Sequence, residues 1–224
     1  CSADGKSAGT VGRNAEGRGE NPLEVLSTCL ALIEIVNSCN LSCPTCYADS
    51  PLMGARALLP AALDEADRSV RAPVVSVEDI QRRVDGVIAR KGKIEILQFS
   101  GGEPTLHPQL VELCRWAKQH PQIDFLLLNT NGVRLAKEPA LCRQLGEVFK
   151  DGGLQVYLQF DGVQEEGQRE LRGGDLRAMR EKAIANLAAA NIPITLAMTV
   201  THDNLPHLWQ AVEFGLRHPI IHGI

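Results

Sequence analysis

The chain has 224 residues, a formal net charge of -4 at pH 7 and an apolar fraction of 44%. This length and apolar content predict a folded globular protein that builds a core without disulfide or metal staples, and they exclude a disordered chain. The longest apolar run, Leu30 to Val36, is too short to span a membrane and contains Glu34. The scattered Lys and Arg residues form no basic footprint for nucleic acid or an anionic membrane.

Predicted strands and helices alternate along the chain. Residues 1–21 hold five glycines among polar residues, which predicts a flexible arm before a core domain over 22–224. Ser76 and Asp79 resemble a capping box that opens one helix. Apolar, β-rich runs predict six strands, at Leu30–Val36, Ile94–Phe99, Phe125–Leu128, Leu154–Phe160, Ile194–Val200 and from Ile220. Helical periodicity predicts further helices over Leu110–Lys118, Pro139–Phe149, Leu176–Ala190 and Leu205–Leu216.

This alternation predicts an α/β fold. Near-continuously apolar strands that are separated by helices indicate a parallel sheet covered on its outer face, either a barrel or an open wound sheet. In both architectures the chemistry lies where the strands end. Polar or glycine-rich turns follow the predicted strands at that edge, with the sequences NSCN, FSGGEP, NTNG, FDG and TVTHDN.

Three of the seven cysteines follow the first predicted strand with C-x3-C-x2-C spacing: Cys39, Cys43 and Cys46. An odd cysteine count favours a reducing, cytoplasmic compartment in which thiols serve as ligands. Structural zinc and iron–sulfur cubanes usually take four ligands, so three local thiolates leave one position open. A zinc site completed by Cys29, Cys1 or a distant histidine remains an alternative.

The second predicted strand ends in Ser100-Gly101-Gly102-Glu103-Pro104. Two successive glycines allow a ligand to approach the backbone and expose carbonyl groups that accept hydrogen bonds from an ammonium group. Glu103 adds a negative charge for a cation. Next to the cysteine loop, this motif favours a small-molecule site over a structural zinc site.

The cysteine loop with Tyr47, together with Gly101–Pro104, resembles the radical S-adenosylmethionine (SAM) superfamily over roughly residues 30–224. The resemblance implies a partial (β/α)6 TIM-like barrel of parallel strands, with the last strand and helix truncated because the chain stops at Ile224. It implies an oxygen-sensitive 4Fe-4S cluster and SAM as cofactors. In such enzymes the cluster reductively cleaves SAM to a 5'-deoxyadenosyl radical, which abstracts hydrogen from a substrate.

The same resemblance assigns roles to individual residues. Cys39, Cys43 and Cys46 are implied as the catalytic cluster ligands, while Gly101, Gly102 and Glu103 are implied to cradle the methionyl ammonium group. Further cofactor-binding positions are implied after the cysteine loop and at strand ends: Tyr47, Gly101, Gly102, Glu103, Pro104, Asn129, Asn131, Gln159, Asp161 and Thr199. Turn capping, or a core role for Tyr47, is the alternative for the residues outside the glycine motif.

The other candidate residues have less specific interpretations. Arg172 could pair with a carboxylate of SAM or of a substrate, but a solvated surface arginine is the favoured interpretation. Cys114 and Cys142 lie within helical patterns and are predicted to be buried. Cys1 and Cys29 could belong to a second metal site.

The stretches CNLSCPTCYADSP and LQFSGGEPTLHP are most similar to the branch with tetraether-lipid synthase and hydroxymethylpterin dimethyltransferase. Molybdenum cofactor biosynthesis protein A is a more distant relative. This branch suggests methylation or carbon–carbon bond formation on an unidentified substrate, with an electron donor such as flavodoxin or ferredoxin. The alternative function is a non-catalytic iron–sulfur or zinc-binding module for electron transfer or structure.

Overall fold

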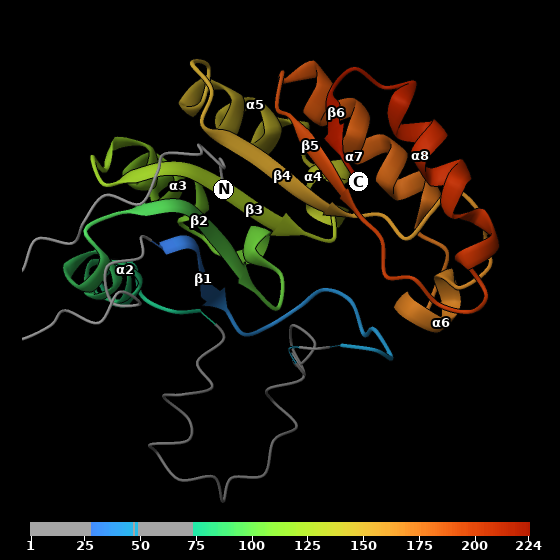
Figure 1. The fold of residues 1–224 in the computed structure, drawn as a ribbon, viewed down its shortest axis with the longest axis horizontal. Coiled ribbons are helices and arrows are strands. Elements are labelled where there is room, and N and C mark those ends of the chain that lie inside the picture. Colours follow the sequence, from blue (N-terminus) through green and yellow to red (C-terminus); the bar gives the residue numbers. More distant parts are fainter. Residues whose placement is uncertain (1–27, 47, 49–73) are drawn as a thin grey trace, which may run out of the picture.

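The computed structural model describes residues 28–46, 48 and 74–224, so the predicted arm over 1–21 lies outside the described residues. Its six strands form one sheet in the sequential order β1-β2-β3-β4-β5-β6, and every neighbouring pair is parallel (Figure 1). The strands are β1 Thr28–Val36, β2 Ile94–Gly101, β3 Ile123–Thr130, β4 Leu154–Gln159, β5 Ile194–Ala197 and β6 Ile221–Gly223. The predicted α/β class with a parallel sheet is confirmed.

Helices connect successive strands. They are α2 Val77–Lys91, α3 Leu110–Gln119, α4 Val133–Lys137, α5 Pro139–Val148, α6 Gln168–Arg172, α7 Arg177–Ala189 and α8 Leu208–Leu216, with 3-10 turns η2 Pro104–Leu106 and η3 Leu205–His207. The predicted cap of α2 is present, because the Ser76 hydroxyl accepts a hydrogen bond from the Asp79 N–H at 3.1 Å. Sequence periodicity missed α4 and α6, since five residues are too few to display a helical repeat.

The two faces of the sheet differ in burial. Phe99, Leu128, Val156 and Ile194 lie in register on four neighbouring strands, and all four are fully buried. This is the face that the helices cover (Figure 1). On β1 the alternate residues Leu30 and Leu32 point to the other face and are about half exposed, at 49% and 47%. Among the described residues, this second face of β1 is therefore less covered than the first.

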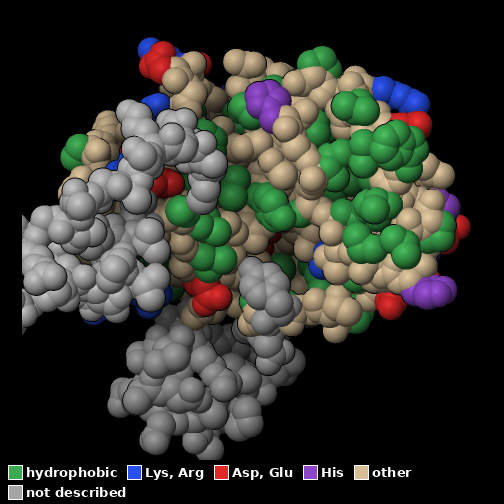
Figure 2. Space-filling view, in the orientation of Figure 1, with side chains coloured by type: hydrophobic (Ala, Val, Ile, Leu, Met, Phe, Trp, Pro, Cys, Tyr) green, Lys and Arg blue, Asp and Glu red, His purple; other side chains and the backbone are tan. Residues whose placement is uncertain are grey.

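The end of the chain forms a sixth strand. Ile221 pairs with Ile194 and Gly223 with Thr195, so the strand predicted to begin at Ile220 is present over three residues. The preceding η3 and α8 expose the large apolar side chains of Leu205, Leu208, Trp209 and Leu216. Figure 2 shows hydrophobic groups gathered on the side of the molecule where α8 lies. In the described part of the chain no helix is long and apolar enough to cross a membrane.

The two helical cysteines lie in the core as predicted. Cys114 on α3 and Cys142 on α5 are both fully buried. Burial raises the pKa of the Cys114 thiol to about 12 and that of Cys142 to about 11, so both remain neutral at physiological pH. They serve as small apolar groups.

The difference between the two faces predicts unequal costs for the same substitution. Leu126→Ala, on the covered face of β3, should lower the free energy of unfolding by about 2–5 kcal/mol because it leaves a cavity in the core. The matched control Leu32→Ala removes a half-exposed side chain and should cost less than about 1 kcal/mol. Urea denaturation followed by circular dichroism measures both, and equal losses would contradict the assignment of the faces.

Candidate functional site

A pocket opens at the carboxyl edge of the sheet, where β1 leads into the cysteine loop. It brings together nine of the residues that the sequence predicts for the site: Cys39, Cys43, Cys46, Gly101, Gly102, Glu103, Asn129, Asn131 and Gln159. Leu41, Thr45, Ala48, Thr130 and Arg172 complete its lining. Pro104, Asp161 and Thr199 do not line this pocket, and Tyr47 lies outside the described residues.

The cysteine loop places its three thiols at different depths. Cys39 is buried, Cys43 is partly exposed and Cys46 is exposed. The Cys39 sulfur accepts hydrogen bonds from the Leu41 N–H at 3.4 Å and from the Asn131 amide at 3.8 Å. Burial raises the pKa of the Cys39 thiol, and the nearby Glu103 and Cys43 raise it further. Across residues 28–46, 48 and 74–224, no three His, Cys, Asp or Glu side chains are gathered so as to hold a metal ion as they stand.

The glycine motif is fastened directly to the segment that enters the cysteine loop. The Gly102 N–H donates to the Val36 carbonyl at 2.7 Å, and the Glu103 N–H donates to the Ser38 carbonyl at 3.0 Å. Gly101 has φ +130°, and a Cβ atom on it would lie 2.1 Å from the Val36 oxygen. Only glycine fits this close approach of β2 to β1.

Glu103 is a buried carboxylate with a full set of donors. Its Oε1 accepts from the N–H of Thr105 at 3.1 Å and from the hydroxyl groups of Thr105 at 2.5 Å and Thr130 at 2.6 Å. Its Oε2 accepts from the Asn131 N–H at 2.8 Å. Burial raises the pKa of Glu103, although these hydrogen bonds lower it in part. The side chain thereby joins the end of β2 to the end of β3.

The two asparagines at the end of β3 have separate partners. The Asn131 side chain donates to the Asn40 oxygen at 2.8 Å and accepts from the Val133 N–H at 3.0 Å, so it closes the turn before α4 and also touches the cysteine loop. The Asn129 amide donates to the Ser100 hydroxyl at 3.3 Å. Asn131 therefore performs the turn capping considered from the sequence while still lining the pocket.

The favoured interpretation of Arg172 as a solvated surface residue is wrong. Its guanidinium is buried, and it donates to both carboxylate oxygens of Asp161, at 2.7 and 2.9 Å, and to the Thr199 hydroxyl at 3.1 Å. The Gln159 amide oxygen, turned toward Arg172, accepts from the guanidinium at 2.8 and 3.0 Å. The sequence did not predict this burial because α6 is too short for a hydrophobic repeat to indicate which of its side chains are buried.

Sequence reasoning missed Arg180 entirely. This α7 residue is fully buried, and it donates to the Phe160 carbonyl at 2.9 Å, to the Gln168 oxygen at 2.6 Å and to Asp161 at 3.2 Å. One signal could have found it. Arg180 occupies the same helical stripe as the buried Ala183, Ile184 and Leu187, and an arginine in an apolar stripe indicates a buried acidic partner.

Of the two predicted candidates near the start of the chain, Cys29 does not line the pocket. Cys29 is exposed near the amino end of β1, at the opposite end of that strand from Cys39, and Cys1 lies outside the described residues. The second metal site suggested for these two cysteines stays a prediction.

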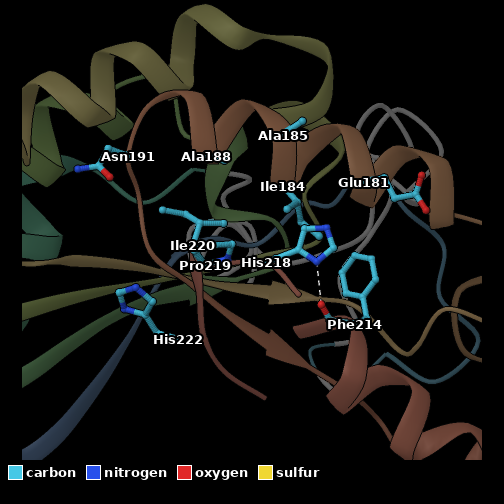
Figure 3. Close-up of a pocket in the computed structure, with 10 residues that line it drawn as sticks. All are labelled: Glu181, Ile184, Ala185, Ala188, Asn191, Phe214, His218, Pro219, Ile220 and His222. Atoms are coloured by element: carbon cyan, nitrogen blue, oxygen red, sulfur yellow. Dashed lines mark hydrogen bonds between the residues drawn. The ribbon is translucent and has the colours of Figure 1, made fainter. Parts of the chain in front are cut away.

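A larger cavity of about 460 Å³ lies on the outer side of the sheet, between α7, α8 and the residues before β6 (Figure 3). His218 hydrogen-bonds the Phe214 carbonyl at 2.7 Å at its rim, through Nδ1. Its lining is Glu181, Ile184, Ala185, Ala188, Asn191, Phe214, His218, Pro219, Ile220 and His222. None of the predicted site residues takes part, so the sequence motifs belong to the smaller pocket.

Comparison with known proteins relates this geometry to a family. Residues 33–215 match the model of the Radical SAM superfamily. The 7,8-dihydro-6-hydroxymethylpterin dimethyltransferase of Methanocaldococcus jannaschii is 33% identical over 163 residues, 71% of this chain and 28% of that protein. A probable GTP 3',8-cyclase of Pyrococcus abyssi is 27% identical over 185 residues, 82% of this chain and 51% of that protein. The chain spans about half of the length of these relatives or less. The first relative matches the dimethyltransferase branch predicted from the sequence, and the second matches the more distant molybdenum cofactor biosynthesis protein A.

Solved structures share the fold. Native anSMEcpe with bound AdoMet and the Cp18Cys peptide superposes with a TM-score of 0.60 at 21% identity, covering 88% of this chain and 50% of that chain. Streptococcus suis SuiB bound to precursor peptide SuiA has a TM-score of 0.60 at 15% identity, covering 96% of this chain and 47% of that chain. This likeness confirms the predicted partial TIM-like barrel.

The contact between β1 and β2 predicts opposite effects of alanine at two glycines. Gly101→Ala should lower the free energy of unfolding by at least about 1–3 kcal/mol, because its Cβ meets the Val36 oxygen at a strained φ. The control Gly86→Ala, in the interior of α2 with nothing within 4 Å of the new Cβ, should raise it by about 0.5–1 kcal/mol. Thermal and urea unfolding measure both values. A neutral Gly101→Ala would show that the close approach is absent in solution.

Proposed function

This chain belongs to the radical SAM superfamily, and we propose that its pocket holds a 4Fe-4S cluster on Cys39, Cys43 and Cys46 with SAM beside it. One observation carries this proposal: the three thiols and the glycine motif line the same pocket, and backbone hydrogen bonds join the glycine motif to the segment just before Cys39. The donor set fits the cluster, since thiolates are its usual protein ligands. Three cysteines leave one iron for SAM.

The chain's own groups have defined tasks in this proposal. The carbonyls beside Gly101 and Gly102 accept from the methionyl ammonium group, and Glu103 keeps that backbone in place through its bonds to β3. Asn129, Asn131 and Gln159 face the same pocket and offer amide groups to the rest of SAM. Tyr47 is proposed to lie beside the adenine.

The proposed activity is radical generation followed by hydrogen abstraction. When bound, such a cluster supplies one electron that cleaves SAM to methionine and a 5'-deoxyadenosyl radical, and this radical takes a hydrogen atom from the substrate. The open face of the sheet, with the half-exposed Leu30 and Leu32, is the proposed place for that substrate. The dimethyltransferase relative supports methylation, or carbon–carbon bond formation, as the outcome on an unidentified substrate.

We infer two further requirements of the same chemistry. The cluster needs an electron from a donor such as flavodoxin or ferredoxin. Cysteine ligands must stay reduced, which favours the cytoplasm as the compartment. The acidic net charge supports no role in binding nucleic acid.

Replacement of one proposed ligand tests the proposal. After anaerobic reconstitution, the unsubstituted protein should bind about four irons and form 5'-deoxyadenosine with dithionite and SAM. Cys43→Ala should lose most of the iron and the nucleoside. The matched control Cys114→Ala changes a buried core thiol and should keep both.

Two outcomes would contradict the proposal. One bound zinc without nucleoside formation would favour a structural zinc module. Four irons without nucleoside formation in the unsubstituted protein would favour an electron-transfer module. Iron and sulfide determination with chromatography of the nucleoside separates these cases.

A further inference from the structure

The buried ion network behind the pocket has an unusual balance of charge. Arg172 and Arg180 share one carboxylate, that of Asp161, and the side chains of Arg180 and Asp161 are fully buried while that of Arg172 is 6% exposed. Two cations and one anion leave one positive charge in excess. Burial lowers the pKa of Arg180 to about 10, to which the charge of Arg172 contributes, so Arg180 is still a cation at neutral pH.

This arrangement is costly for stability. Buried ion pairs are often no more stabilising than apolar residues of similar size, and an unbalanced charge is worse. The Nε atom of Arg180 is buried with no hydrogen-bond partner among the described residues. Asp161 adopts the left-handed conformation with φ 62°, which non-glycine residues seldom adopt. Strain of this kind gathers at functional sites.

The network is directed toward the cysteine loop. Arg172 lines the pocket beside Cys43, and Asp161 holds its guanidinium through two hydrogen bonds while Thr199 adds a third. Burial tends to lower the pKa of Arg172, but the bonds and charge of Asp161, and then contact with Cys43, raise it overall. The charge of Arg180 also interacts with Cys43.

The helix that carries Arg172 packs on the same loop. The Thr45 hydroxyl donates to the Leu171 carbonyl at 3.3 Å, and the position of a Cβ on Gly173 would lie 3.4 Å from the Ser42 carbonyl oxygen. The loop around Cys43 and the charged network are therefore parts of one packed unit. A charge fixed in this unit acts on the thiolates through protein rather than through water, so it is weakly screened.

We propose that Asp161 and Arg180 are positioning residues that hold Arg172 beside Cys43, and that the excess positive charge of the three side chains favours the reduced state of a cluster on this loop. The proposal rests on the proposed function. Reduction adds one negative charge to the cluster, and a nearby fixed cation stabilises that charge. Asp161 thereby acts through Arg172 and not by direct contact with SAM.

The test is the midpoint potential of the reconstituted cluster, measured by a redox titration followed by electron paramagnetic resonance. Arg180→Gln removes the excess charge, and the ratio of reduced to oxidised cluster at a fixed potential should fall about tenfold, which is a midpoint about 59 mV more negative. Asp161→Asn keeps a side-chain oxygen that accepts from Arg172, so Arg172 stays beside Cys43 while one negative charge is lost, and the midpoint should move in the opposite direction. Arg180→Lys should retain most of the unsubstituted value.

The control lies on the same helix. Arg177→Gln removes a cation that pairs with Asp175 at the surface, and it should leave the midpoint unchanged because water screens it. Shifts of the same sign in Arg180→Gln and Asp161→Asn would indicate structural damage and overturn the proposal, as would no shift in either. If Arg180→Gln does not fold, the direction of the Asp161→Asn shift decides the outcome. An unsubstituted protein without a cluster would instead overturn the proposed function and this inference with it.

Discussion

The site depends on the attachment of β2 to the segment that leaves β1. The Gly102 and Glu103 N–H groups donate to the carbonyls of Val36 and Ser38, immediately before the first cysteine of the loop. The approach is close enough that residue 101 must be glycine. The Glu103 side chain then ties this junction to β3. Three strand ends are thereby held in one geometry, and the thiols and the glycine backbone come to face one pocket.

A second group of polar side chains, centred on Asp161, contacts the cysteine loop near Cys43. Asp161, at the end of β4, gathers Arg172 from α6, Arg180 from α7 and the Thr199 N–H after β5. The two groups meet at the cysteine loop: Asn131 touches Cys39 from the Glu103 side, and Arg172 lies beside Cys43. A loop of three thiols has little apolar surface of its own. Its conformation therefore rests on these buried polar contacts.

Much of the fold and most of the residues that line the pocket could be predicted from the sequence because their signals are local. Apolar runs marked the strands, and the Ser76 cap marked the start of α2. The cysteine spacing and the Ser100–Pro104 motif marked the pocket. The buried state of Arg172 could not be predicted in the same way, and the apolar stripe around Arg180 indicates its burial without identifying its partner, because both contacts depend on how α6 and α7 pack against the end of β4.

The sequence by itself determined the parallel α/β fold and the family. Hydrophobic periodicity, the cysteine spacing and the Ser100–Pro104 motif are all local patterns of neighbouring residues. Only the tertiary structure decided which polar side chains face the pocket and which stand behind it. Asp161 ends up buried behind Arg172, and the exposed Thr199 bonds to both of them, across 11 to 38 residues of sequence. The sequence does not distinguish a strand-end carboxylate that binds a ligand from one that pairs with a buried arginine. Burial and charge pairing arise only when distant elements pack together.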